Sequence, residues 1–157
     1  MLKNKKNPLH EDLDHILAHT TELWKELRNK KIFITGGTGF FGCWFLESLI
    51  WANDKLGINA DAVVLTRDYN AFYKKSPYLA THPKIRFHIG DICDFEFPEG
   101  EFSHIIHAAA ETKTKLHEKN PITMFDSIIN GTKKILDFAL ACNAKKFLFT
   151  SSHHSIH

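Results

Sequence analysis

The sequence has 157 residues, of which 43% are hydrophobic and 24% are charged, and its formal net charge is +2. These values are ordinary for one globular domain, so they exclude a disordered or collagen-like chain. The small net charge gives no argument for a nucleic-acid partner, and we expect none.

Three cysteines, at positions 43, 93 and 142, lie far apart and form no C-x-x-C pair. This usage favours a reduced intracellular protein without disulfide bonds. The N-terminus carries no apolar core of a signal peptide, and no apolar run approaches the ~20 residues that span a bilayer. We therefore expect a cytoplasmic protein with no membrane partner.

Residues 1–30 are expected to form a helical extension. Asn7-Pro8 resembles a helix cap followed by proline, and apolar residues then recur at helical spacing, which predicts an amphipathic packing helix over about 9–28. His15 and His19 lie one turn apart but have no visible third ligand, so we predict no metal site. The apolar positions of this helix are Leu13, Ile16, Leu17, Leu23, Trp24 and Leu27.

Residues 31–44, KIFITGGTGFFGCW, read as an apolar strand, a glycine-rich turn and the start of a helix. Among the glycines at 36, 37, 39 and 42, the last three have the G-x-G-x-x-G spacing, which allows a tight turn, close approach of the backbone to a pyrophosphate, and close packing of helix on strand. The free N–H groups at the helix start would hold the phosphates. We predict a dinucleotide site, the alternative being an ordinary glycine-rich turn. The predicted cofactor-binding residues here are Gly36, Gly37, Thr38, Gly39, Phe40, Phe41 and Gly42.

From residue 31 onward, strand-like and helix-like segments alternate. We expect strands at 31–35, 61–66, 84–89, 102–109 and 146–151, helices at 40–53 and 122–142, and a helix or loop at 69–79. Helix-length crossovers predict an α/β fold, a Rossmann-like parallel sheet of order 3-2-1-4-5 with helices on both faces, truncated after strand five. The incomplete NAD(P)-binding domain would span 31–152, with a disordered tail at 153–157. The long helix offers as apolar positions Phe125, Ile128, Ile129, Ile135, Leu136 and Phe138.

Four segments together resemble the extended short-chain dehydrogenase/reductase family of NAD(P)-dependent epimerases, dehydratases and reductases, many of which act on nucleotide sugars. They are TGGTGFFG at 35–42, GDICD at 90–94, HAAA at 107–110 and FLFTSS at 147–152. The resemblance implies that Asp91 contacts the adenine, with Ile92 beside it. It also implies that the segment after strand four lines the cofactor, and that strand five delivers a catalytic hydroxyl. The residues so implied are Ala108, Ala109 and Ala110 for the cofactor, and Ser152 for catalysis, with Thr150 and Ser151 as weaker candidates.

The end of the second strand bears on the choice between NAD and NADP. NAD-selective enzymes place an acidic residue there to bind the ribose hydroxyls. Here Thr66 holds that position and Arg67 follows, and an arginine can form paired hydrogen bonds with a 2′-phosphate. The segment therefore favours NADP slightly, and the alternative is that Arg67 is only a solvated loop residue.

The sequence departs from the family in two places. Ile128 stands where many members have an asparagine on the long helix, so that phosphate contact is not carried over. None of the three tyrosines begins the family's catalytic Tyr-x-x-x-Lys, and all three precede the third strand. We therefore expect a cofactor-binding part of a longer enzyme, which binds cofactor weakly and catalyses nothing alone. Histidines in the last five residues fit a frayed end better than a metal cluster.

The leading hypothesis is the NAD(P)-binding portion of a nucleotide-sugar epimerase or dehydratase, whose nicotinamide accepts a hydride from a sugar carbon. An NADPH-dependent alcohol or ketone reductase fragment and a non-catalytic NAD(P)-binding module remain alternatives. The fifth strand would be a short apolar edge, and such edges pair with other chains. Aggregation or a homodimer is therefore expected.

Overall fold

The computed structural model describes residues 7–109 and 121–151. Its strands are β1 (Lys31–Thr35), β2 (Asp61–Thr66), β3 (Ile85–Ile89), β4 (His104–His107) and β5 (Lys146–Phe149). Its helices are α1 (His10–Lys25), α2 (Phe40–Leu56), α3 (Tyr69–Lys75), α4 (Pro77–Ala80) and α6 (Pro121–Ala141). Within these two ranges, no helix has both the length and the apolar character that crossing a membrane requires.

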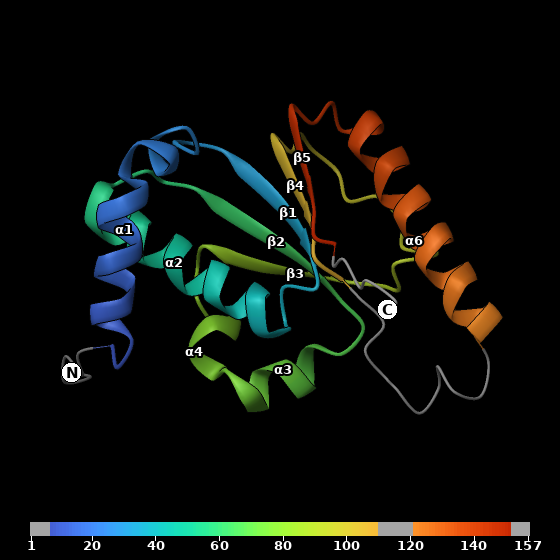
Figure 1. Cartoon of the computed structure of the whole chain (residues 1–157), viewed down its shortest axis with the longest axis horizontal. Coiled ribbons are helices and arrows are strands. Elements are labelled where there is room, and N and C mark those ends of the chain that lie inside the picture. The colour runs from blue at the N-terminus through green and yellow to red at the C-terminus, as the bar shows by residue number, and fades with distance from the viewer. Residues whose placement is uncertain (1–6, 110–120, 152–157) are drawn as a thin grey trace, which may run out of the picture.

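The five strands form one sheet in the order β3-β2-β1-β4-β5, and each neighbouring pair is parallel (Figure 1). The predicted fold class and strand order are confirmed. Because all strands are parallel, their carboxyl ends lie at one edge of the sheet. The segments that follow β1, β2, β3 and β4 therefore converge there, and every predicted cofactor residue among the described ones lies in one of these segments or at the start of α2.

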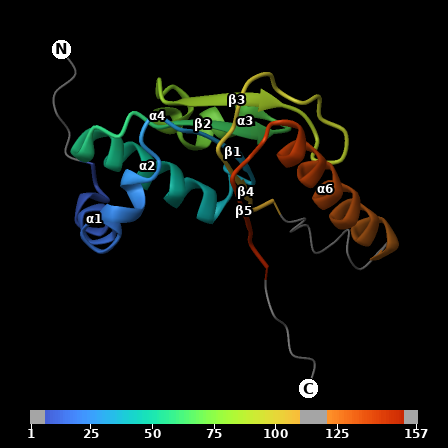
Figure 2. The same cartoon turned by 90° about the horizontal axis from the view of Figure 1, so that it is seen from above.

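Two hydrophobic clusters cover the two faces of the sheet. Alternate residues of a strand point to opposite faces, so Ile32 and Ile34 of β1 pack toward α2 and α4, whereas Phe33 packs toward α6. Helix α1 packs against α2, and α6 lies on the other side of the molecule (Figure 2). The side chains of Leu13 and Trp24 on α1 are buried, whereas Leu23, another of its predicted apolar positions, is 64% exposed.

Several element boundaries differ from the sequence-based expectation for local reasons. Helix α2 continues to Leu56, where Gly57 adopts a left-handed conformation with φ +58° and ends it. The expected helix at 69–79 divides at Ser76, because a residue before proline disfavours helical backbone angles. Strand β5 stops at Phe149, which pairs with the last residue of β4, His107.

An aromatic core joins α6 to the sheet. Phe138 is 1% exposed, and its ring centroid lies 4.7 Å from Phe33, 5.4 Å from Phe102 and 5.8 Å from Phe95. Such pairs stabilise beyond the area they bury. The apolar positions of α6 therefore divide into a buried group, Ile135 and Phe138, and an exposed group that the spacing alone did not separate. The exposed group is Ile122, Phe125, Ile128, Ile129, Leu136 and Leu140.

Phe138→Ala should lower the free energy of unfolding by about 3–5 kcal/mol, because it leaves a cavity among packed rings. Leu140→Ala is the matched control on the same helix, since this side chain is 82% exposed. Its effect should stay below about 0.5 kcal/mol. Urea titration followed by circular dichroism measures both, and equal effects of the two substitutions would contradict this account of the core.

The edge strand β5 exposes Leu148 at 56%, and the outer side of α6 exposes Ile129 at 47%. We predict that the chain self-associates in analytical ultracentrifugation, because edge strands and apolar helix faces bind other chains. Leu148→Lys with Ile129→Lys should give a monomer. Leu23→Lys, on α1, should not, and a wild-type chain that stays monomeric at high concentration would refute the prediction.

Candidate cofactor site

The glycine turn after β1 packs directly on the segment after β4. Gly36 has φ +72°, which favours glycine, and a Cβ there would collide with the Ala108 carbonyl and lie 2.6 Å from the Ala109 nitrogen. Gly42 is equally restricted, because its Cβ would collide with the backbone of Gly36 and Gly37. Both positions therefore require glycine for packing, and the two segments form one continuous wall.

Gly39 differs from these two glycines. It precedes the first residue of α2 with φ −79° and ψ −174°, and an added Cβ would meet only the Gly36 carbonyl oxygen, at 3.2 Å. No side chain caps this end of α2, and its first turn holds no acidic residue. The first N–H groups of a helix have no partner within the helix. The turn at 36–39 and the uncapped first amides of α2 together leave a space, called the cradle below, that could hold a diphosphate.

Phe40 and Phe41 begin α2 and are 72% and 76% exposed, with their rings edge to face at 5.4 Å. Exposed phenylalanines are unusual for a helix that otherwise packs closely on a sheet. Their backbone amides belong to the first turn of α2, as the sequence predicted. Phe40 lines a hollow that is also lined by Cys43 and Lys75.

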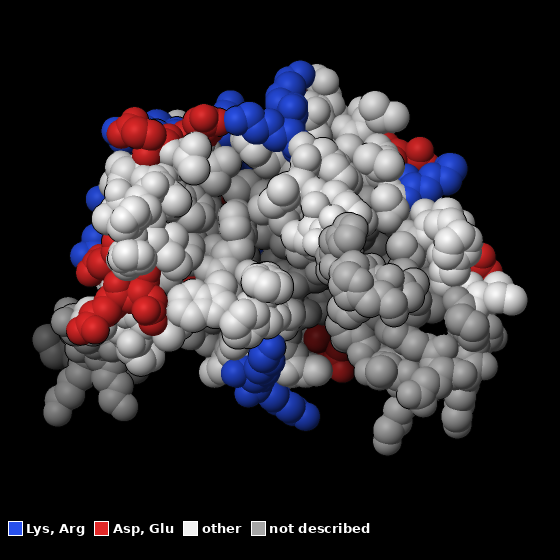
Figure 3. All heavy atoms as spheres, in the orientation of Figure 1, with Lys and Arg blue, Asp and Glu red and all other residues white. Residues whose placement is uncertain are grey.

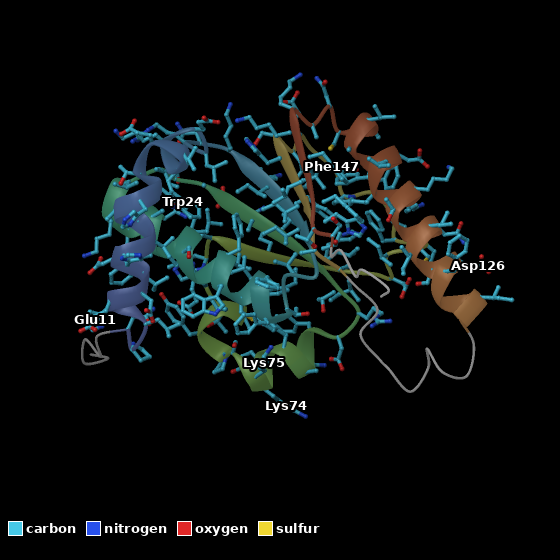
Figure 4. The ribbon with its side chains drawn as sticks, in the orientation of Figure 1. Glu11, Trp24, Lys74, Lys75, Asp126 and Phe147 are labelled. Carbon is cyan, nitrogen blue, oxygen red and sulfur yellow. The ribbon has the colours of Figure 1, made fainter. Side chains whose placement is uncertain are left out.

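Lys75, at the end of α3, contacts the glycine turn and was not predicted from the sequence. Its Nζ donates to the Thr38 carbonyl oxygen at 3.0 Å and lies 4.0 Å from the Cys43 Sγ. Burial raises the pKa of the Cys43 thiol, and the ammonium of Lys75 opposes this shift. Lys74 points away from the molecule (Figure 4), and basic side chains gather over α3 at the lower edge of the face in Figure 3.

The end of β2 carries no free carboxylate in the position that would bind ribose hydroxyls. The Thr66 hydroxyl accepts the backbone N–H of Asp68 at 3.3 Å. The Asp68 carboxylate caps α3 by accepting the N–H of Ala71 at 2.8 Å. The first acidic residue after β2 therefore has a structural role as the cap of α3.

Arg67 and Asp91 meet between the ends of β2 and β3, as two predicted cofactor residues. The Arg67 Nη1 lies 3.7 Å from the Asp91 Oδ2, while the other Asp91 oxygen accepts the N–H of Cys93 at 3.0 Å. Ile92 packs against α6, where an added Cβ on Gly131 would lie 3.0 Å from its Cγ2. A hollow of about 540 Å³ opens beside Arg67.

A buried polar group lies at the end of β4 and was also missed by the sequence analysis. The Thr35 Oγ1 and the His107 Nδ1 are 2.6 Å apart, and the Ala109 N–H donates to the same Oγ1 at 3.2 Å. His107 is 4% exposed, its Nε2 lies 3.4 Å from the Thr132 Oγ1, and burial lowers the pKa of its imidazole.

The catalytic candidates lie at the end of β5. The Thr150 backbone N–H and its hydroxyl both donate to the His107 carbonyl oxygen, at 3.0 and 3.3 Å, so this residue has a structural role. Ser151 is exposed. Ser152 and Ala110 lie outside the described residues, as do the terminal histidines. Within the described ranges, no group of three His, Cys, Asp or Glu side chains could hold a metal.

The chain is similar to known enzymes over most of its length. The profile described as the NAD dependent epimerase/dehydratase family matches residues 32–156. A dTDP-glucose 4,6-dehydratase of Actinoplanes sp. is 31% identical over 127 residues, covering 78% of this chain and 40% of that protein. A UDP-glucose 4-epimerase of Lacticaseibacillus casei is 29% identical over 126 residues, covering 77% of this chain and 35% of that protein.

Among solved structures, the dTDP-glucose 4,6-dehydratase DesIV of Streptomyces venezuelae, with NAD and TYD bound, matches with a TM-score of 0.58 and 26% identity. The match covers 74% of this chain and 38% of that one. The chain thus spans 35–40% of the length of these proteins. By its sequence match over residues 32–156, and in keeping with its glycine turn and its sheet order, the chain belongs to the NAD-dependent epimerase/dehydratase family.

Proposed function

We propose that this chain is the NAD(P)-binding portion of a nucleotide-sugar epimerase or dehydratase of the cytoplasm. The observation that carries the proposal is the uncapped start of α2 beside the glycine turn, where contacts at Gly36 in the turn and Gly42 in α2 leave no space for side chains. The family and the sugar-nucleotide enzymes that the chain is similar to support the same function.

In this proposal, the first amides of α2 bind the diphosphate of the cofactor, and Arg67 and Asp91 bind its adenosine end. The peptide between Ala108 and Ala109 forms the wall on the β4 side, where it rests on Gly36. When bound, the nicotinamide would supply a hydride acceptor for a sugar carbon. The residues of this chain hold and orient the cofactor, and the glycines of the turn leave space for it because they carry no side chains.

Catalysis by these 157 residues alone is not part of the proposal, because they contain no Tyr-x-x-x-Lys. In that family pair, the tyrosine exchanges the substrate proton and the lysine lowers its pKa. Ser152 would polarise the substrate oxygen beside them. Measurable epimerase or dehydratase turnover by the purified chain would contradict this.

Gly39→Ser should separate cofactor binding from folding. Serine is a preferred cap at the start of a helix, whereas its Cβ would press on the Gly36 carbonyl oxygen at 3.2 Å, so the free energy of unfolding should change by less than about 1 kcal/mol. The new side chain would occupy the cradle and engage its amides, so calorimetry with NADH and NADPH should show at least about tenfold weaker binding.

Gly57→Asn is the matched control, because this glycine caps the far end of α2 and has no atom within 4 Å of its Cβ position. Asparagine tolerates the left-handed conformation there. This variant should bind both dinucleotides like the wild type. If the Gly39→Ser chain binds the dinucleotides as strongly as the wild type, the phosphates do not bind at the start of α2.

We further propose that NADP binds more tightly than NAD, since Asp68 caps α3 and Arg67, paired with Asp91, places a positive charge directly after β2. Arg67→Ala should weaken NADPH binding about tenfold and change NADH binding less than twofold, because a charge-assisted hydrogen bond to phosphate is lost. Lys74→Ala, which removes one exposed charge from α3, should change neither. Tighter binding of NADH than of NADPH by the wild type would refute the preference.

A further inference from the structure

We infer that His107 is a positioning residue of the cofactor site: through the Thr35 hydroxyl, it holds the Ala108–Ala109 peptide against Gly36. This inference rests on the proposed cofactor-binding function. None of the sequence motifs assigned a role to His107 or Thr35. The argument starts from three distances that share one oxygen atom.

The hydrogen atoms around the Thr35 Oγ1 can be assigned. A hydroxyl has one hydrogen to donate and two lone pairs. The Ala109 N–H can only donate, so it occupies one lone pair at 3.2 Å. The short 2.6 Å contact with the His107 Nδ1 then uses the hydroxyl hydrogen, since no other acceptor for it is found among the described residues. The Nδ1 is therefore bare, and the proton of the neutral ring sits on Nε2, facing the Thr132 Oγ1.

These hydrogen bonds hold the Ala108–Ala109 peptide in place on the side of Thr35. The Ala108 N–H also donates to the Thr35 carbonyl oxygen at 3.0 Å, so both amides of the segment are held by one residue of β1. The same peptide also contacts Gly36 so closely that a Cβ on Gly36 would not fit. Loss of the His107 acceptor would free the Thr35 hydroxyl to rotate and would loosen the peptide that lines the site.

The surroundings keep the His107 ring neutral. Thr35 and His107 are 1% and 4% exposed, and the ring lies 5.2 Å from that of Phe149. On the elements packed around it, Asp126 of α6 is exposed, and the other charged side chains of the described part of the chain are engaged elsewhere. They are Lys31 over Phe102, Lys133 with Asp137, Lys134 over Phe97, and Lys146 with Glu26. Burial alone therefore lowers the pKa of the ring below its ordinary value of 6.5.

Protonation would place a hydrogen on Nδ1 and abolish the acceptor. Cofactor affinity should therefore be constant above pH 6.5 and should fall as the pH drops through the lowered pKa of His107. The same sign applies to folding: the unfolded chain binds the proton more readily, so stability is complete above 6.5 and is lost below it.

Nitrogen NMR of the 157-residue chain without cofactor tests the hydrogen assignment directly. The His107 Nε2 should show the shift of a protonated nitrogen and Nδ1 that of a bare one at pH 7.5. The opposite tautomer would overturn the inference. This measurement does not depend on whether the chain binds a dinucleotide.

Binding of NADH and NADPH by four variants tests the role. His107→Leu and Thr35→Val each remove one side of the short bond, and each should weaken binding about tenfold. His107→Asn offers a carboxamide oxygen near the place of Nδ1, so it should restore affinity to within about threefold and remove the dependence on pH. His104→Asn is the matched control, because this half-buried histidine lies at the other end of β4.

Urea titration of each variant ensures that only folded chains are compared. Thr35→Val replaces the hydroxyl by a methyl group of similar size, so it tests the bond even if His107→Leu misfolds. Failure of the wild type to bind either dinucleotide would contradict the proposed function. Binding by the wild type that Thr35→Val leaves unchanged, or that His107→Asn fails to restore, would overturn the inference alone.

Discussion

The site depends on one close contact, in which the turn after β1 lies on the peptide after β4. Gly36 meets Ala108 and Ala109 with no space for a side chain, and Gly42 brings α2 equally close to the same turn. These two contacts fix the start of α2 relative to the carboxyl edge of the sheet. The uncapped amides of α2 therefore face an open cradle rather than the protein interior.

Local patterns in the sequence predicted the parts of the fold that local physics determines. Strands β1 and β2 were placed correctly because each is a short apolar run, and the glycine turn marks the end of β1. The ends of β4 and β5 were wrong by two residues each, because a strand stops where its neighbour stops pairing. Spacing also could not tell which apolar positions of α6 would be buried, since the buried Ile135 and the exposed Leu136 both fit the helical pattern.

The glycines were predicted as site residues from their spacing, Asp91 from the family resemblance and Arg67 from its place after the second strand. The contacts of Thr35, His107 and Lys75 could not be predicted, although Thr35 and His107 begin two of the motifs, because their partners are distant in the chain: 72 residues separate Thr35 from His107, and 37 separate Lys75 from Thr38. A histidine that ends an apolar strand gives no sign of its hydrogen-bond partner. Only the register of β1 with β4, which pairs Thr35 with His107, brings the two side chains together.

Amide NMR titration of the wild-type chain with NADPH tests the central claim most directly. The account predicts that the largest shift changes fall on the amides of residues 36–42, with smaller changes at Asp91 and Ala109. These residues converge at the carboxyl edge of the sheet. Saturating changes confined to other surfaces, or no changes at millimolar NADPH and NADH, would contradict it.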